Sequence, residues 1–422
     1  MLNSPATVLL LGTFDSKGSE FAYLRECLIE CELNVITMNV GILGSTDQLP
    51  VDIQASQVTE AVGCQLQTLS QTRDRGNGIK VMGTGAAALA LSLYERGRIQ
   101  GVIGMGGSGG TGLVTSAMRA LPLGVPKVCL STVASGQVAP YVGIKDIVMI
   151  PSIVDVSGLN RILKGAIRRA AGVMQGLMKV TDPRNDVDRP LIAASMFGNT
   201  TACVDHCRQL LDQQGYETLI FHATGTGGRV LESLVSAGFV DGVLDITTTE
   251  WADEICGGIF SAGPERLDAA GANCIPHLIV PGCLDMCNFG PPDSVPQVYR
   301  DAGRQFYEWS PEVTLMRTNI EENIRLGEIF ARKANAAKGP VALLIPLRGF
   351  SLLDGDGESF CNRETDLAFL DALKKDLDQN VPLIELDTPI NSTEFAETAT
   401  KLMLSLIQKQ EFASTKYDSS FH

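Results

Sequence analysis

The stretch "GVIGMGGSGGTGLV", residues 101–114, holds five glycines, one serine and one threonine between Gly104 and Thr111. The apolar run before the glycines is typical of a buried strand, and "TGLVTSAMRAL" after them is typical of a helix. Glycine lets other groups approach the backbone closely, and the N-terminus of a helix attracts anions. The stretch therefore predicts a strand–loop–helix unit whose loop either holds an anion or makes a tightly packed turn.

The same alternation of short apolar runs and longer helical runs extends along the chain. In the first half the predicted strands are 7–12, 34–40, 101–105, 127–133 and 146–150, with helices at 19–32, 53–69 and 159–178. In the second half the predicted strands are 191–198, 218–225, 242–249, 277–282, 314–318, 341–349 and 382–387, with helices at 321–337 and 392–410. Continuously apolar strands that alternate with helices indicate parallel sheets covered on both faces. We therefore expect an α/β protein with two doubly wound, mainly parallel, Rossmann-like domains.

A polar segment separates the two halves. The segment "KVTDPRNDVDRP", residues 179–190, is charged and contains two prolines, as inter-domain linkers often do. A chain of 422 residues is long enough for two or three domains. We expect a nucleotide-binding α/β domain over 1–180 and a second α/β domain, carrying substrate or catalytic groups, over 190–422.

Composition excludes some classes of partner. The net charge is −14 and the sequence has no cluster of Lys and Arg, which argues against a nucleic-acid partner. The apolar run near the N-terminus is too short to span a membrane, and the 11 cysteines show no disulfide-framework spacing. We therefore expect a cytoplasmic protein with a small-molecule substrate and without a membrane partner.

Polar residues after the predicted strands are the candidates for ligand binding, because open α/β sheets bind ligands at the carboxyl ends of their strands. Thr13, Asp15 and Lys17 follow the first strand and are expected to share a crevice with the glycine loop. The loop candidates are Gly104, Gly106, Gly107, Ser108, Gly109, Gly110 and Thr111. Taken singly, Asp15 would be a turn residue and Lys17 a surface charge. The segment "RDRG", residues 73–76, either adds a charge to this crevice or forms an exposed turn before a helix.

The glycine spacing favours a mononucleotide over a dinucleotide. Gly104, Gly106 and Gly109 satisfy GxGxxG, but their loop does not follow the first strand of the domain. An acidic strand end about 20 residues later, expected for a dinucleotide site, is also missing. The sequence has no Walker A motif either. Backbone amides would then hold the phosphates, and Asp15 would help to place Mg²⁺.

The second half has its own polar strand ends. His222, Glu250, Asp285 and Arg348 each follow or end a predicted strand. If these strands are neighbours, the four side chains would converge and could serve acid–base catalysis or bind a metal. The alternative for each residue is that it caps the following helix.

Nine ordered motifs carry a family resemblance. They are "LGTFDSKGSE", "GMGGSGGT", "APYVG", "PSIVDVSGLN", "FHATGTGG", "DITTTEWADE", "PGCLDMCNFG", "VTLMRTNIEEN" and "GPVALLIPLRGFS". From about residue 6 to about residue 390 the chain resembles the poorly characterised family that includes the ATP-binding N-terminal domain of the tomato mosaic virus resistance protein. The resemblance implies ATP binding in the first half, at Thr13, Asp15, Lys17 and residues 104–111, and a homodimer. It implies no reaction.

Three functions stay open at this point. The first is an ATP-dependent enzyme, such as a phosphotransferase or ligase, that acts on a small metabolite. The second is an enzyme whose acid–base or metal chemistry lies in the second domain, with a regulatory nucleotide. The third is a nucleotide-sensing protein without turnover. We expect the first, with ATP as the cofactor and Mg²⁺ as its companion ion.

Overall fold

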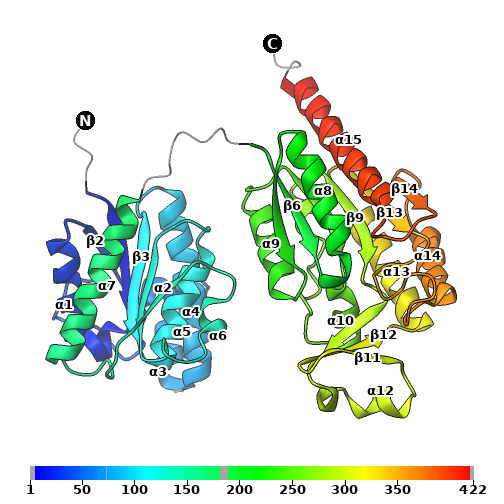
Figure 1. Ribbon diagram of the computed structural model, residues 1–422. Helices are drawn as coiled ribbons and strands as arrows, with labels where there is room; N and C mark the ends of the chain where they lie inside the picture. The colour runs from blue at the N-terminus through cyan, green and yellow to red at the C-terminus, as the bar shows by residue number, and fades with distance from the viewer. Residues whose placement is uncertain (1–4, 73, 181–188, 419–422) are drawn as a thin grey trace. The chain divides into compact units, whose positions relative to one another are not determined.

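The computed structural model describes residues 5–72, 74–180 and 189–418. The chain divides into two compact units, Met1–Asn185 and Asp186–His422 (Figure 1). Most of the predicted linker over 179–190 lies outside the described residues. Both units are α/β and contain a parallel sheet flanked by helices, which confirms the expected fold class.

The N-terminal unit has a five-stranded parallel sheet in the order β2-β1-β3-β4-β5. Its strands are β1 (Thr7–Gly12), β2 (Asn34–Asn39), β3 (Gly101–Gly106), β4 (Lys127–Ser131) and β5 (Val148–Pro151). Its helices are α1 (Phe14–Glu30), α2 (Ala55–Glu60), α3 (Leu66–Thr72), α4 (Arg75–Glu95), α5 (Ser108–Ala120), α6 (Ala139–Val142) and α7 (Arg161–Lys179). The strand order reverses between β1 and β3, which is where an open α/β sheet binds its ligand.

Alternate residues of β1 are buried in two different cores. Val8 and Leu10 pack against α1 and α7, whereas Leu9 and Leu11 pack against α2, α4 and α5. Helices therefore cover both faces of the sheet, as Figure 1 shows. This arrangement explains why the strands are continuously apolar, since neither face meets water.

The C-terminal unit has a six-stranded parallel sheet in the order β14-β13-β9-β8-β6-β7. Its strands are β6 (Leu191–Met196), β7 (Glu217–His222), β8 (Gly242–Thr247), β9 (His277–Gly282), β13 (Val341–Pro346) and β14 (Leu383–Leu386). Its helices are α8 (Thr201–Gln213), α9 (Thr226–Ser236), α10 (Glu250–Cys256), α11 (Ala269–Ala272), α12 (Gln297–Asp301), α13 (Ile320–Asn335), α14 (Arg363–Asp376) and α15 (Thr393–Asp418). One face of the sheet packs against α8 and α15, and the other packs against α9, α11, α13 and α14.

Several elements differ from the sequence prediction. A small antiparallel sheet joins β10 (Met286–Phe289), β12 (Val313–Arg317) and β11 (Phe306–Ser310), and only the middle strand was expected. The predicted helix over 53–69 is two short helices, α2 and α3. The glycine-rich stretch that follows forms the long helix α4, which the low helix propensity of glycine concealed.

No helix in the described ranges has the length and apolar character needed to span a membrane.

The glycine in the middle of β3 is a packing requirement. A Cβ on Gly104 would lie 2.6 Å from the carbonyl oxygen of Leu11 and 2.7 Å from both methyl groups of Val114. Both neighbours are buried, on β1 and on α5. Gly104 therefore brings α5 close to the sheet, and with it the loop that begins the helix.

Replacing Gly104 by Ala should lower the free energy of unfolding by about 1–3 kcal/mol, because the added methyl group overpacks this contact. Gly112→Ala is the matched control, since a Cβ there meets no atom of the structure within 4 Å and sits inside α5. It should raise stability by about 0.5–1 kcal/mol. Urea denaturation measures the free energy of unfolding of both variants. Equal changes in this free energy would contradict the packing role of Gly104.

Candidate functional site

A cavity of about 810 Å³ opens at the carboxyl edge of the N-terminal sheet. Thr13 and Gly107, the residues that follow β1 and β3, both line it. The cavity therefore lies at the strand-order reversal of this sheet, and its volume is within the usual range for a small-molecule site.

Backbone amides form one wall of the cavity. Helix α5 begins at Ser108, and its N-cap residue Gly107 offers no side-chain cap. The first N–H groups of a helix have no acceptor within the helix. Among the described residues none accepts a hydrogen bond from the N–H groups of Ser108, Gly109 or Gly110, whereas the N–H of Thr111 already bonds to the Gly107 carbonyl. These three amides can receive an anion.

The sequence candidates divide into residues that line the cavity and residues that pack beneath it. The lining residues are Thr13, Asp15, Lys17, Gly107, Ser108, Gly109 and Gly110. Gly104, Gly106 and Thr111 are buried and lie behind this wall. A Cβ on Gly106 would lie 2.8 Å from the Cα of Gly110, and the Thr111 hydroxyl bonds to the Ser131 hydroxyl at 2.6 Å. These three residues shape the loop and do not face the cavity.

Asp15 holds the segment after β2 in place. Its Oδ2 accepts a hydrogen bond from the N–H of Leu43 at 2.7 Å, and a Cβ on Gly41 would lie 2.2 Å from its carboxylate. Asn39, at the end of β2, accepts hydrogen bonds from the N–H groups of Phe14 and Gly41. Together they fix one rim of the cavity, and sequence reasoning missed Asn39 because it sits inside a predicted strand.

Lys17 occupies a distorted position in α1. Its backbone is not helical, with φ −137° and ψ 34°, and its ammonium donates a hydrogen bond to the carbonyl oxygen of Val156. The side chain lines the cavity but is already used to tie α1 to the segment after β5.

An apolar wall faces the amide wall. Ile42 and Leu43 come from the segment after β2, and Ile79 and Met82 come from α4. Arg75, one turn before Ile79, also lines the cavity. Of the segment 73–76, which was expected to add a charge to this crevice, Arg75 supplies that charge, and Arg73 lies outside the described residues. The spacing of Arg75, Ile79 and Met82 places them on one face of a helix and would have pointed to the site had α4 been recognised.

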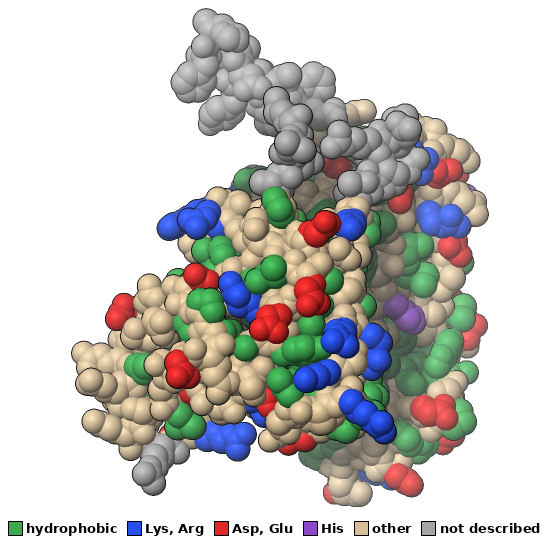
Figure 2. All heavy atoms as spheres, turned by 90° about the vertical axis from the view of Figure 1, so that its left-hand side faces the viewer, with side chains coloured by type: hydrophobic (Ala, Val, Ile, Leu, Met, Phe, Trp, Pro, Cys, Tyr) green, Lys and Arg blue, Asp and Glu red, His purple; other side chains and the backbone are tan. Residues whose placement is uncertain are grey.

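The N-terminal half is not acidic, although the chain is. Residues 1–180 contain 15 Lys and Arg but only 12 Asp and Glu, so the net charge of −14 arises in the second half. Helix α7 carries five basic side chains and no acidic one. Figure 2, which looks onto the N-terminal unit, shows Lys and Arg side chains gathered along one side of it. The acidity of the whole chain is therefore no argument against an anionic ligand in the N-terminal unit.

The glycine loop of the C-terminal unit is filled by the protein itself. Gly225 and Gly228, in the loop before α9 and its first turn, both donate backbone hydrogen bonds to Glu250 Oε1, at 2.9 and 3.0 Å. Glu250 is 1% exposed. Its carboxylate takes the place that an anionic ligand would occupy, so this loop is a poor site for phosphate.

Arg266 neutralises the buried carboxylates beside that loop. It donates to Glu250 Oε2 at 2.7 Å, to Glu232 Oε1 at 3.0 Å and to both oxygens of Asp245. The imidazole of His277 also bonds to Asp245, at 2.8 Å. Burial alone would raise the pKa of Asp245, but Arg266 and His277 outweigh it and hold that pKa below its ordinary value. Burial prevails at Glu250, whose pKa is raised despite Arg266.

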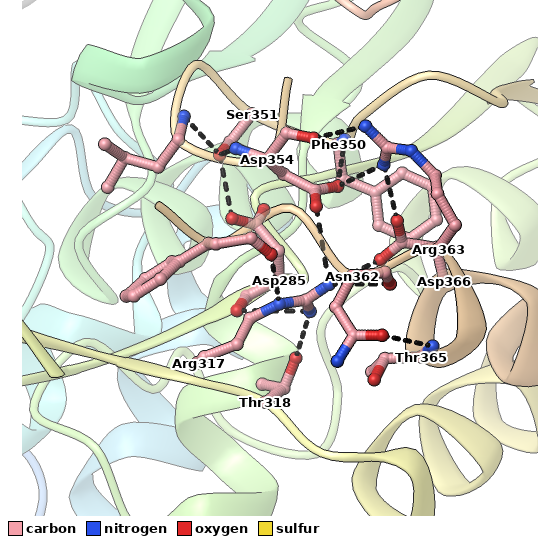
Figure 3. Close-up of polar contacts among 12 residues, drawn as sticks. Asp285, Arg317, Thr318, Phe350, Ser351, Asp354, Asn362, Arg363, Thr365 and Asp366 are labelled. Atoms are coloured by element: carbon pink, nitrogen blue, oxygen red, sulfur yellow. Dashed lines mark hydrogen bonds and ion pairs between the residues drawn. The ribbon is translucent and has the colours of Figure 1, made fainter. Parts of the chain in front are cut away.

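A second buried network surrounds Asp285 (Figure 3). Asp285 Oδ2 accepts a hydrogen bond from the Ser351 hydroxyl at 2.8 Å, while its Oδ1 has no partner among the described residues. Arg317 pairs with Asp366 at 2.7 Å and with Asp354 at 3.4 Å, and Arg363 pairs with the same two carboxylates. The network joins the β9–β10 turn, β12, the loop after β13 and the start of α14.

The network around Asp285 has more carboxylates than guanidinium groups. Three buried aspartates face two arginines, so one negative charge is left over. Burial, reinforced by Asp285, raises the pKa of Asp354 to about 8. Burial also raises the pKa of Asp285 to about 6, against the opposing effect of Arg317. A proton held by this pair neutralises the excess charge at neutral pH.

The four catalytic candidates of the second unit do not converge. His222 ends β7 and Arg348 follows β13, and β6, β8 and β9 lie between these strands. Four strand spacings amount to about 19 Å. Arg348 is exposed and pairs with Asp356. The condition for convergence is met only in part: β8, β9 and β13, which precede Glu250, Asp285 and Arg348, are neighbours, but β6 separates β7 from them. Glu250 and Asp285 also belong to separate buried networks.

Among the four candidates, His222 is exposed and forms no ion pair within the described ranges. Its Nδ1 lies 3.1 Å from the Met196 carbonyl oxygen, and its ring lies at a tilt beside Phe197, with 5.4 Å between the ring centroids. Across residues 5–72, 74–180 and 189–418, no group of three or more His, Cys, Asp or Glu residues could hold a metal ion.

The proton on the Asp354 and Asp285 pair predicts a pH dependence of stability. Both acids have folded pKa values above the value of about 4 expected in the unfolded chain. The folded state therefore retains protons that the unfolded chain has released, and the contribution of the network to stability falls as the pH rises from about 4 to about 8. Asp354→Asn imitates the protonated acid and should reduce this slope by up to about 1.4 kcal/mol per pH unit.

Chemical denaturation between pH 5 and pH 7 measures the slope, because both of these pH values lie about one unit inside that window. Asp356→Asn is the control, because its carboxylate is exposed at the edge of the same network and has a lowered pKa, owing to its hydrogen bonds with Arg348 and Arg363. The control should keep the slope of the unchanged protein. Identical slopes in all three proteins would show that the buried pair holds no proton.

Comparison with known proteins identifies relatives of both units. A family model described as the N-terminal domain of an uncharacterised protein family, UPF0261, matches residues 6–183. The model of the C-terminal domain of the same family matches residues 189–407. A UPF0261 protein of Clostridium tetani is 42% identical over 403 residues, which cover 95% of this chain and 99% of that protein.

A plant relative is longer. The ToMV resistance protein Tm-1(GCR237) of Solanum lycopersicum is 35% identical over 429 residues, which cover 96% of this chain but 56% of that protein. Among solved structures, the glycosyltransferase SsfS6 of Streptomyces sp. SF2575 in complex with thymidine diphosphate covers 96% of this chain and 99% of its own, at 12% identity. Its TM-score of 0.21 is too low to support any argument about fold or function. The two family models and the near full-length relative show that this chain belongs to the uncharacterised protein family UPF0261.

Proposed function

We propose that the N-terminal unit binds ATP in the cavity between β1 and β3. The observation that carries this proposal is the set of N–H groups on Ser108, Gly109 and Gly110, which open into a cavity of about 810 Å³ without an acceptor among the described residues. A second wall is apolar. A ligand that suits both walls has an anionic end and a flat apolar end, as a nucleotide has.

The phosphates would lie at the start of α5. Helix dipoles and unbonded amides at a helix N-terminus favour negative charge. The cavity is lined by the first turn of α5, whereas α1 is interrupted at Lys17 and α4 passes along the cavity through Ile79 and Met82. Three neighbouring amides at α5 can donate to several phosphate oxygens, which supports a ligand with a phosphate chain.

The base would lie against the apolar wall. Ile42, Leu43, Ile79 and Met82 line the cavity, and the Leu43 side chain is 82% exposed. An exposed leucine at the mouth of a cavity gains free energy when a ring covers it. The family resemblance is the reason for choosing adenine among the bases.

Mg²⁺ would enter with ATP. Asp15 is the one carboxylate among the described residues that line the cavity, and Leu43 N–H occupies only its Oδ2. Mg²⁺ commonly binds to one or two carboxylates together with phosphate oxygens. Asp15 therefore fits an ion that would also relieve the repulsion between its own charge and the phosphates.

As the reaction we propose phosphoryl transfer or ligation on a small metabolite, in a cytoplasmic homodimer. The amides at α5 would stabilise charge on the transferred group. The nucleotide-sensing alternative gains support from the burial of Glu250 and Asp285, because these carboxylates are engaged inside the fold. Of the four candidates only His222 and the ion-paired Arg348 are exposed. Release of ADP during incubation with metabolite mixtures separates an enzyme from a sensor.

Calorimetric titration with ATP tests the site. Gly109→Val should weaken ATP binding by at least about a hundredfold, because its side chain would fill the space where a phosphate approaches and would crowd Arg75 and Ile79. Omitting Mg²⁺ should weaken binding in the unchanged protein.

Gly112→Ala serves as the control in the same helix, since its added Cβ contacts no atom within 4 Å, and it should bind ATP as the unchanged protein does. Far-UV circular dichroism confirms that each variant is folded. Unchanged ATP affinity in Gly109→Val would remove the phosphates from this loop.

A further inference from the structure

We propose that Arg75 is the side chain that recognises phosphate charge in this cavity, so that the site selects nucleotides with two or three phosphate groups over those with one or none. This inference rests on the proposed nucleotide site and adds a specificity-determining residue to it.

Arg75 lies directly against the glycine loop. It is the first residue of α4, and its guanidinium is so close to Gly109 that a Cβ on that glycine would lie 3.3 Å from Nη2 and 4.0 Å from Nε. The N–H groups at the start of α5 and the guanidinium of α4 thus border the same space. A phosphate oxygen placed there can accept from both, and arginine presents its donors in a planar fork that matches phosphate.

No described residue neutralises the charge of Arg75. Its side chain is exposed, and no carboxylate within the described ranges forms an ion pair with it. The carboxylate of Asp74, the preceding residue, caps α4 by accepting from the N–H of Asn77. A cation in the first turn of a helix is unfavourable by itself, because it faces the positive end of the helix dipole. An anion between α4 and α5 would turn this cost into a favourable interaction.

The other cation of the cavity is already committed. The Lys17 ammonium donates to the carbonyl oxygen of Val156, and these two residues tie α1 to the segment after β5. Arg75 and Lys17 are the basic residues among the described residues that line the cavity. Arg75 is therefore the one whose positive charge is available to an incoming ligand.

Arg75 also sets the direction of the ligand. Ile79 and Met82 follow it on the same face of α4, so the cavity wall changes from cationic to apolar along one helix. The phosphate chain would extend toward Arg75 and the base toward Met82. Met82 lies seven residues after Arg75, about 10 Å along the helix. With the base near Met82, only the second and third phosphate groups would reach the space between the α5 amides and the guanidinium, and AMP would bind without it.

The test is a comparison of ATP, ADP, AMP and adenosine affinities in Arg75→Met and in the unchanged protein. Arg75→Met should weaken ATP and ADP binding by about tenfold or more, since a charge-assisted pair is lost. AMP and adenosine affinities should change by less than about threefold. Inorganic tripolyphosphate should lose its ability to compete with labelled ATP in the variant.

Lys80→Met is the matched control, because it removes one positive charge from an exposed position on the same helix that does not line the cavity. Its ATP affinity should be that of the unchanged protein. If Arg75→Met binds ATP normally while Gly109→Val does not, the inference about Arg75 is overturned and the nucleotide site stands. If the unchanged protein binds none of the four ligands, the proposed function fails, and this inference falls with it.

Discussion

The first N–H groups of a helix require acceptors, and a parallel sheet collects several such helix starts at one edge. The two units of this protein meet the requirement in different ways. In the C-terminal unit Glu250 is buried against the glycine loop and accepts from Gly225 and Gly228. In the N-terminal unit the amides of Ser108 to Gly110 have no internal acceptor among the described residues, and they open into a cavity. The two glycine loops are similar, but the amides of the C-terminal one are occupied by Glu250, whereas those of the N-terminal one are available to a ligand.

The internal carboxylate has consequences for the rest of the C-terminal unit. A buried carboxylate needs a cation, and Arg266 supplies it. A buried guanidinium needs more than one carboxylate, and Asp245 and Glu232 complete its pairing. The buried polar residues in this region therefore satisfy one another. Each link follows from the desolvation cost of the previous charge, so the network is explained without any ligand.

The alternation of strands and helices could be predicted from the sequence because it depends on local apolar periodicity. The position of Thr13 and the glycine loop beside each other could also be anticipated, since β1 and β3 are adjacent in 2-1-3-4-5, one of the common strand orders of doubly wound sheets. Helix α4 was not predicted because its first half is rich in glycine. The apolar wall of the cavity, to which α4 contributes, was therefore not predicted either. The order of six strands is a long-range property, and it separates His222 from Arg348 although both stand at strand ends.

Asp15 shows how a residue type can suggest one role and the structure another. A carboxylate in a cavity that contains the N-terminus of α5 would be attracted to that helix end, yet its Oδ2 bonds to Leu43 N–H and its side chain fills the space that Gly41 leaves open. The same carboxylate thus fixes the segment that carries Ile42 and Leu43, which form the apolar side of the cavity. Asp15 couples the two walls: a phosphate that binds at α5 would repel it, and a cation between them would hold both in place. In the proposed site, ligand charge and the position of the apolar rim would therefore be linked through one side chain.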